Sequence, residues 1–238
     1  MPSNLKPVGF FVTGTDTEVG KTLVSGALLL QLQKKYSKVI GYKPVVAGVS
    51  EIDGKLQNED LVSLAIASTH EAANLVSNIC PYILETPSAP HLVATNNQID
   101  LSYEKMLGGY QALANQGDAI VVEGVGGFKV PFHQGKNSAD FAKDLGLPVI
   151  LVVGMRLGCI NHALLTIEAI QSRGLIIAGW VANCTSEMNL LDQNIESLKD
   201  MIDAPLLGVI PKLDHQLIQT PYTKSALEKA ASYINLPS

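Results

Sequence analysis

The segment Val8–Thr22 constrains the fold of this chain more than any other part of the sequence. It reads VGFFVTGTDTEVGKT, an apolar run that passes into a glycine-rich turn and ends on Gly20, Lys21 and Thr22. Glycines let successive backbone N–H groups point into such a turn, and the helix that follows adds a partial positive charge. The pattern predicts a phosphate-binding loop, with Lys21 reaching the β- and γ-phosphates of a nucleotide and the Thr22 hydroxyl on Mg²⁺.

The spacing within this loop is a variant of the usual one. Five residues separate Gly14 from Gly20, whereas the common pattern has four residues between its first glycine and the Gly-Lys-Thr triplet. The alternative is a glycine-rich turn that binds nothing. The Thr-Asp-Thr-Glu stretch at 15–18 disfavours that alternative, because it is too polar to serve only as packing.

Composition narrows the function classes. The 238 residues carry a formal net charge of −5, and no stretch concentrates Lys and Arg. A nucleic-acid partner is therefore not expected, since binding a phosphate backbone needs clustered positive charge. The sequence contains no Pro/Ser-rich linker, so we expect one domain over residues 1–238.

Cysteine usage and hydropathy suggest a compartment. Cys80, Cys159 and Cys184 are odd in number and too far apart for a metal knuckle, which fits a reducing environment. The first seven residues lack the apolar region of a secretory signal, and no apolar run reaches about 18 residues. We expect a soluble, cytoplasmic protein without a membrane partner.

Short apolar runs alternate with amphipathic segments along the chain. This pattern predicts an α/β fold of the P-loop NTPase type, a mostly parallel open sheet with helices on both faces and ligands at the carboxyl ends of its strands. The connection Gly48–Asn58 reads as long and irregular. The expected strands are Val8–Thr13, Val39–Tyr42, Ala119–Val122, Pro148–Val153, Ile176–Ala182 and Leu206–Ile210. The expected helices are Thr22–Lys35, Glu59–Ala67, Leu101–Gln116, Ser138–Leu145, Asn161–Arg173, Asn189–Ile202 and Thr223–Tyr233.

Three charged residues lie at the ends of these predicted strands and helices. Lys43 leaves the second strand on the same edge as the glycine-rich loop, where it is either a second cation for the γ-phosphate or a solvated strand-end lysine. Glu123 follows four apolar residues and precedes three glycines within four positions, so it is either a metal ligand or a salt-bridged glutamate. Asp60 begins a predicted helix, and by itself it is best interpreted as a helix cap.

Two later segments also carry polar groups at the expected ligand edge. Gly158–Asn161 opens a helix and can present free N–H groups to an anion. Cys159 is interpreted as a packing residue, because His162 is the one acid–base partner near it in the sequence. Asn183 ends a strand with an amide that can pair with a purine or simply form a turn. Pro211–Leu213 follows the last strand and can border the base.

Several motifs in order resemble those of the dethiobiotin synthetase family. The resemblance spans most of the chain and is far more specific than one phosphate-binding loop. It rests on Gly14–Thr22 with its five-residue spacing, Gly41–Val45, Pro81–Tyr82, Pro87–His91, Val122–Gly127, Leu157–His162 and Gly179–Asn183.

This resemblance implies an ATP- and Mg²⁺-dependent ligase that carboxylates 7,8-diaminopelargonate with CO₂ and closes the ureido ring of dethiobiotin. The route would pass through an N-carbamate and its phosphorylated anhydride. The family forms a homodimer in which the Gly158–Asn161 turn serves the neighbouring subunit's site. A helix N-terminus there would receive the substrate carboxylate.

The resemblance also assigns roles to residues of this chain. It makes Lys43, Lys21, Thr17 and Glu18 catalytic, and it turns Asp60 from a cap into a magnesium ligand beside Thr22 and Glu123. Substrate would contact Thr17, Lys43, Ala47, Gly158, Cys159, Ile160 and Asn161. Nucleotide would contact Glu18, Val19, Gly20, Lys21, Thr22, Leu23, Asp60, Glu123, Gly124, Val125, Gly126, Asn183, Cys184, Pro211, Lys212 and Leu213.

Two positions depart from the family pattern. The family commonly has a serine four residues after its active-site lysine, and this chain has Ala47 there. Family members often carry an acidic residue after the adenine-facing asparagine, where this chain has Cys184, which leaves nucleotide selectivity open. Two alternative functions are a related P-loop ligase that acts on a larger substrate and a partitioning-type ATPase. The first usually carries a glutaminase domain, and the second usually has an extra lysine early in the loop.

Overall fold

The computed structural model describes residues 7–52, 54–69, 79–132 and 135–237. Residues 1–6 lie outside these ranges. They make up most of the segment from which we inferred that a secretory signal is lacking. In the described part, a six-stranded parallel sheet has the strand order β10-β9-β8-β1-β7-β2. The strands are β1 (Val8–Gly14), β2 (Val39–Tyr42), β7 (Ala119–Glu123), β8 (Val149–Gly154), β9 (Ile177–Asn183) and β10 (Leu206–Ile210). The α/β prediction is confirmed, and the predicted strand ends differ from these by at most one residue.

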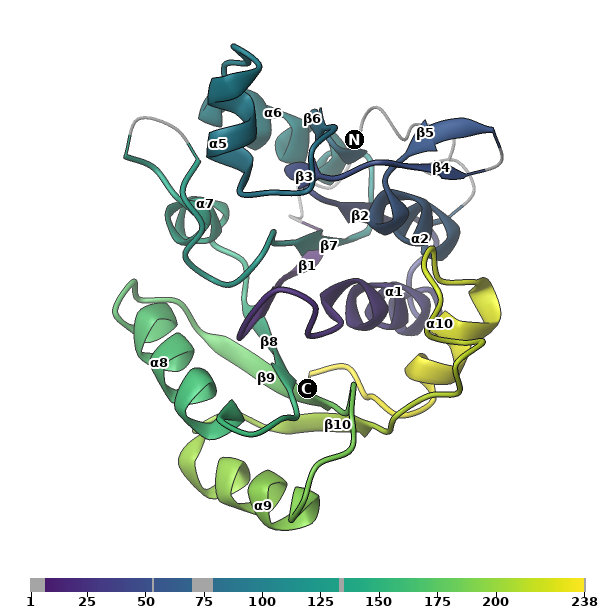
Figure 1. Ribbon diagram of the computed structural model, residues 1–238, viewed down its shortest axis with the longest axis vertical. Coiled ribbons are helices and arrows are strands. Elements are labelled where there is room, and N and C mark those ends of the chain that lie inside the picture. The colour runs from purple at the N-terminus through teal and green to yellow at the C-terminus, as the bar shows by residue number, and fades with distance from the viewer. Residues whose placement is uncertain (1–6, 53, 70–78, 133–134, 238) are drawn as a thin grey trace, which may run out of the picture.

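Burial on both faces explains why these strands read as continuous apolar runs. Every residue of β7 and β8 is buried, as a parallel sheet covered by helices on both sides requires. Figure 1 shows α1, α2 and α10 on one side of the sheet and α7 and α8 on the other. The helices are α1 (Lys21–Leu32), α2 (Glu59–Ala67), α5 (Pro90–Asn96), α6 (Tyr103–Ala114), α7 (Ser138–Leu145), α8 (Cys159–Gln171), α9 (Leu191–Met201) and α10 (Lys224–Ala231).

Local sequence signals set the limits of several helices. At α7, the Asn137 side chain accepts hydrogen bonds from the backbone N–H groups of Ala139 and Asp140, and the Asp140 carboxylate accepts one from the Asn137 N–H. This capping box starts the helix, and Gly146, with φ +65°, ends it. The predicted boundaries of α7 are therefore confirmed.

Helix α1 forms the centre of its layer, with α2 and α10 packed against it. Gly26 permits the close approach of α10, because a Cβ atom there would lie 2.6 Å from Leu227 Cδ2. The C-terminal segment is thereby held beside the helix that follows the glycine-rich loop. The predicted helix at Thr223–Tyr233 corresponds to α10.

The predicted irregular connection Gly48–Asn58 is wrong. It contains an antiparallel hairpin of β4 (Ser50–Ile52) and β5 (Lys55–Gln57). The sequence analysis also missed α5 and a two-stranded parallel sheet of β3 (Val45–Ala47) and β6 (Tyr82–Leu84). Strands of three residues are too short for alternation to be recognised in the sequence.

Within the described residues, no helix is both long enough and apolar enough to cross a membrane.

Candidate active site

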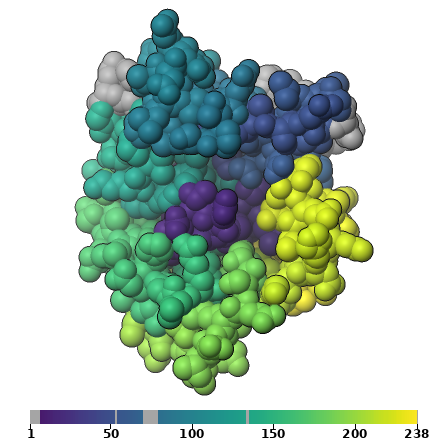
Figure 2. All heavy atoms as spheres, in the orientation of Figure 1, coloured from purple at the N-terminus to yellow at the C-terminus, as the bar shows by residue number. Residues whose placement is uncertain are grey.

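A pocket of about 820 Å³ opens at the carboxyl ends of β1, β2 and β7. In Figure 2 the purple N-terminal part of the chain lies recessed between the blue and teal segments, the green segments and the yellow C-terminal segment. Ligands of open parallel sheets bind at this edge. The wall draws on residues from seven stretches of the chain, 17–23, 43–47, 59–60, 87–90, 123–130, 183–185 and 211–222.

The glycine-rich loop places an open helix start in this pocket. Gly20 precedes α1 with φ +87°, and among the described residues no side chain caps that end of the helix. The first turn of α1 also carries no acidic residue. The backbone N–H groups there are suited to bind an anion such as a phosphate.

Lys21 lies buried at the start of α1. Its Nζ donates to the Asp16 carbonyl oxygen at 2.8 Å, so the side chain folds back along the loop. Burial, followed by the neighbouring Lys43 ammonium, lowers the pKa of Lys21 to about 8. The carboxylates of Glu123, Asp60 and Asp16 compensate this buried cation only in part, so a bound anion would stabilise its charge further.

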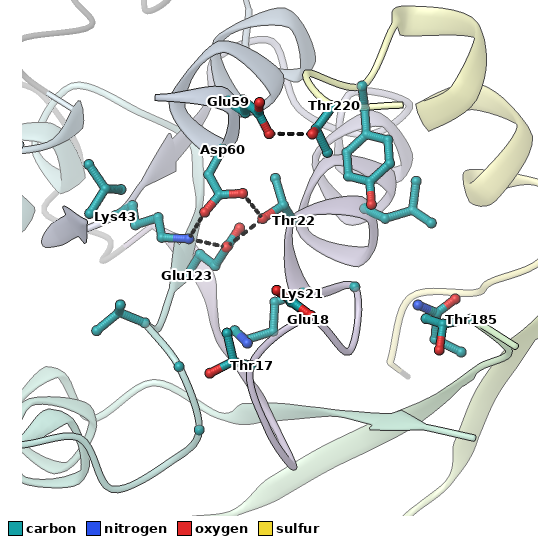
Figure 3. A pocket seen from close by; sticks show the side chains of 18 of the residues that line it. Thr17, Glu18, Lys21, Thr22, Lys43, Glu59, Asp60, Glu123, Thr185 and Thr220 are labelled. Carbon is teal, nitrogen blue, oxygen red and sulfur yellow. Dashed lines mark hydrogen bonds and ion pairs between the residues drawn. The ribbon is translucent and has the colours of Figure 1, made fainter. Parts of the chain in front are cut away.

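A second cluster of charges lies beside it (Figure 3). Lys43 Nζ lies 2.6 Å from Asp60 Oδ2 and 2.6 Å from Glu123 Oε1. Thr22 Oγ1 lies 2.7 Å from Asp60 Oδ1 and 2.8 Å from the same Glu123 oxygen. Lys43 comes from the end of β2, Glu123 from β7, Thr22 from α1 and Asp60 from α2. The sheet edge thus collects two carboxylates, one ammonium and one hydroxyl.

Burial makes these charges depend on one another. Lys43 is 3% exposed and Glu123 is 0% exposed. Burial alone would lower the pKa of Lys43, but Glu123 and Asp60 together outweigh it and raise that pKa. Burial likewise acts to raise the pKa of Asp60, and Lys43, the Thr22 hydroxyl and Lys21 lower it. The directions of both shifts favour the charged forms of Lys43 and Asp60, because the two groups face each other.

The donor set fits a hard divalent cation. Both carboxylates and the Thr22 hydroxyl supply oxygen atoms, which are the ligands that Mg²⁺ prefers. Glu123 Oε2 is buried and has no hydrogen-bond partner among the described residues. An unpartnered buried carboxylate oxygen is costly, and a cation would satisfy it.

Asp60 does not cap α2, which corrects the interpretation made from its position alone. The cap is Asn58, whose side-chain oxygen accepts from the backbone N–H groups of Asp60 and Leu61. Because Asn58 satisfies the helix start, the Asp60 carboxylate can turn toward Lys43 and Thr22.

Asn183 lies against the glycine-rich loop. Its Nδ2 donates to the Val19 carbonyl oxygen at 2.8 Å. A Cβ atom at Gly20 would lie only 2.0 Å from that nitrogen, so this glycine is required for space as well as for its positive φ. The end of β9 therefore braces the loop.

The other residues assigned from the sequence divide into two groups. Thr17 and Glu18 are exposed and line the pocket. Leu23, Ala47, Val125, Gly126, Cys184, Pro211, Lys212 and Leu213 line it as well. Those that do not line this pocket are Val19, Gly124, Gly158, Cys159, Ile160 and Asn161.

One part of the pocket wall was not predicted from the sequence. Thr220 Oγ1 donates to Glu59, and Ser63 Oγ accepts from the Tyr222 backbone N–H at 2.9 Å. These contacts hold the segment before α10 against α2, and Ile218, Thr220 and Tyr222 line the pocket. No local pattern marks this segment, because it reaches the site only through tertiary packing.

Comparison with known proteins adds a sequence relationship. A family model described as an AAA domain matches residues 8–218. The ATP-dependent dethiobiotin synthetase BioD of Aromatoleum aromaticum is 47% identical over 207 residues, which cover 87% of this chain and 91% of that protein. The protein of the same name from Ralstonia nicotianae is 46% identical over 210 residues, with the same coverage.

Solved structures share the fold at low sequence identity. A ParA family ATPase from Chlorobium tepidum has a TM-score of 0.55 and 12% identity, covering 95% of this chain and 96% of that one. A putative plasmid partition protein from Borrelia burgdorferi, bound to AMPPNP, has a TM-score of 0.52 and 13% identity, covering 95% of both chains. These two matches show the P-loop NTPase-like fold alone.

Proposed function

Because this chain belongs to the family of ATP-dependent dethiobiotin synthetases, an ATP-dependent ligase family of biotin synthesis, we propose that it acts through a carbamate. One amine of 7,8-diaminopelargonate adds to CO₂ and loses a proton. A carbamate oxygen then bonds to the γ-phosphorus of ATP as the bond between that phosphorus and ADP breaks. The second amine attacks the carbonyl carbon of the anhydride, the ring closes, and phosphate and a proton leave.

One observation carries this proposal, the meeting of Lys43 with Asp60 and Glu123 beside the glycine-rich loop. The γ-phosphoryl group would lie between this cluster and Lys21, where two ammonium groups neutralise charge on the transferred oxygens. Thr17 and Glu18, exposed at the pocket, would bind the carbamate and shape the phosphate site. Positioning and charge neutralisation account for most of the expected catalysis.

Thr22, Asp60 and Glu123 would hold Mg²⁺, and the unpartnered Glu123 oxygen supports this assignment. When bound, the ion supplies positive charge to the β- and γ-phosphates. Lys43 contacts both carboxylates at 2.6 Å, so its ammonium would turn toward the phosphate or carbamate oxygens once another cation neutralises them.

Asn183 would contact the base. Its amide nitrogen donates one N–H to Val19, which leaves the second N–H as a donor and the amide oxygen as an acceptor. Such a pair matches the donor and acceptor edge of a purine. Cys184, Pro211, Lys212 and Leu213 line the same part of the wall and would border the base.

The Gly158–Asn161 turn would act across a homodimer. Gly158 begins α8 with φ +91°, and among the described residues no side chain caps this helix. The turn does not line the pocket of its own chain, so its N–H groups would bind substrate carboxylate in the neighbouring subunit. Sedimentation that finds only active monomers would remove this role.

The test is an assay with Mg-ATP, bicarbonate and 7,8-diaminopelargonate, in which dethiobiotin and ADP should form in equal amounts. The Lys43→Ala variant should lose turnover while it retains ATP binding. Normal turnover in this variant would refute the role of Lys43. ATP hydrolysis that does not depend on the diamine would favour the partitioning-type alternative.

A further inference from the structure

The buried side chain of Asn58 links the start of α2 to the turn after β3. Its amide oxygen accepts from the N–H groups of Asp60 at 3.1 Å and Leu61 at 3.2 Å, and its amide nitrogen donates to the Gly48 carbonyl oxygen at 2.7 Å. Asn58 is 9% exposed, so water competes little for these bonds. All the hydrogen-bonding groups of the amide except one N–H are used.

The acceptor bonds set the position of the Asp60 backbone. They satisfy two N–H groups at the start of α2, which frees the carboxylate of Asp60 for Lys43 and Thr22. The metal-binding side of the proposed site therefore depends on the oxygen of this amide.

The donor bond sets the position of the turn after β3. Gly48 has φ +103°, and its N–H donates to the Leu84 carbonyl oxygen at 2.9 Å. A Cβ atom at Gly48 would lie 3.1 Å from Pro87 Cβ, so the turn packs directly on the 87–90 segment. Ala47 and Pro87 both line the pocket. The nitrogen of the amide thus holds the wall on which the diamine is expected to rest.

We propose that Asn58 is a positioning residue that fixes the distance between the Asp60 carboxylate and the Ala47–Gly48 wall. It touches neither nucleotide nor diamine and acts through Asp60 and Gly48. This inference rests on the proposed roles of Lys43 and Asp60. It adds a residue that the sequence motifs do not mark, since an Asn before a helix reads only as a cap.

Two substitutions at Asn58 test the bonds to α2 and the bond to Gly48 separately. Asn58→Ser keeps a hydroxyl that can cap α2 but is too short to reach Gly48, whereas Asn58→Ala loses both functions. Thermal stability should fall less in the serine variant than in the alanine variant, because only the alanine variant loses the helix cap as well as the bond to Gly48. Loss of one hydrogen bond to the wall should raise the KM for the diamine in both variants by about three- to ten-fold. Only the alanine variant should also need more Mg²⁺ for half-maximal rate.

The chain offers a matched control at α7. Asn137 caps that helix with the same acceptor bonds, to Ala139 and Asp140, and does not line the pocket. Asn137→Ala should lose stability as Asn58→Ala does and keep the parent KM. A parent-like diamine KM in Asn58→Ser would overturn the proposal, as would an equal rise in KM for Asn137→Ala. Full activity of Lys43→Ala would instead count against the proposed function, whatever the Asn58 variants show.

Discussion

At the scale of single residues, the site is organised around a buried ammonium. Lys43 neutralises two carboxylates that the fold places together, one of them fully buried. Taking charges out of water costs more than an exposed ion pair returns, so such a cluster is kept for what it does more than for stability. Removing the ammonium leaves both carboxylates without the counter-charge that they share.

This arrangement predicts how Lys43→Met responds to divalent cations. Loss of the ammonium should destabilise the protein by about 3 to 5 kcal/mol, because the fully buried Glu123 then lacks its counter-charge and faces the partly exposed Asp60 carboxylate. Mg²⁺ should therefore raise the melting temperature of this variant more than that of the parent. Calorimetry without nucleotide, with and without Mg²⁺, measures the difference.

Lys21→Met is the matched control for that measurement. The Lys21 side chain bonds to the Asp16 carbonyl oxygen and acts on the carboxylates only at longer range, so its loss should change the response to Mg²⁺ less than Lys43→Met does. An equal shift with Mg²⁺ in Lys43→Met and in the parent would contradict the assignment of Asp60 and Glu123 as ligands.

Ala47 predicts a substrate-affinity effect. It lines the pocket at the end of β3, where family members commonly present a serine hydroxyl. Ala47→Ser should lower the KM for 7,8-diaminopelargonate, since one hydrogen bond contributes about 0.5 to 1.5 kcal/mol. Steady-state kinetics with saturating ATP measures this, and an unchanged or higher KM would show that the hydroxyl makes no such contact.

At the scale of elements, the start of α1 is held by the end of β9. Gly20 combines a left-handed φ with contact to Asn183, whereas Gly174 has a similar φ of +73° and open space around it. Gly20→Ala should cost more than about 2 kcal/mol and weaken ATP binding, because Asn183 must give up its bond to Val19. Gly174→Ala should cost about 1 kcal/mol and leave ATP binding unchanged.

Urea denaturation and calorimetric ATP titration of both variants compare the two effects. Adding Asn183→Ala to Gly20→Ala should recover stability by removing the clash. Equal losses at Gly20 and Gly174 would show that backbone strain alone, without the brace, accounts for the effect.

At the scale of the whole molecule, buried ionisable groups predict alkaline sensitivity. Burial raises the pKa of the Cys80 thiol from 9.0 to about 12. Above pH 9 the unfolded chain loses this proton while the folded chain keeps it, so stability falls as pH rises from 9 toward 12. At pH 10 this thiol alone should cost about 1.4 kcal/mol relative to neutral pH.

Urea unfolding of the parent and of Cys80→Ala at pH 8 and pH 10 checks this expectation. The variant should lose less stability than the parent between the two values. The same loss in both proteins would mean that the thiol does not contribute.

The single-domain prediction for residues 1–238 leads to a second whole-molecule test. Trp180, the one tryptophan of the chain, is fully buried in β9, so its fluorescence reports on the packing around this part of the sheet. Its urea transition should coincide with that of far-ultraviolet circular dichroism. Separate transitions would indicate two independently folding units.

The sequence by itself determined the elements and the loop. Continuous apolar runs such as Val149–Gly154 and the glycine-rich turn before Lys21 are local patterns, and local patterns follow from backbone and burial periodicity. They gave the parallel sheet, its helices and the edge where ligands bind. The hairpin within 48–58 could not be predicted in this way, because strands of three residues are too short to show a periodic pattern.

Only the tertiary structure decided which groups face one another. Lys43 and Glu123 are 80 positions apart, and their contact depends on β2 lying beside β7 in register. The bond from Asn58 Nδ2 to the Gly48 carbonyl oxygen likewise depends on the turn after β3, which packs on Pro87. Pairings between distant residues leave no trace in local periodicity, since they arise only when burial forces charged and polar groups to find partners.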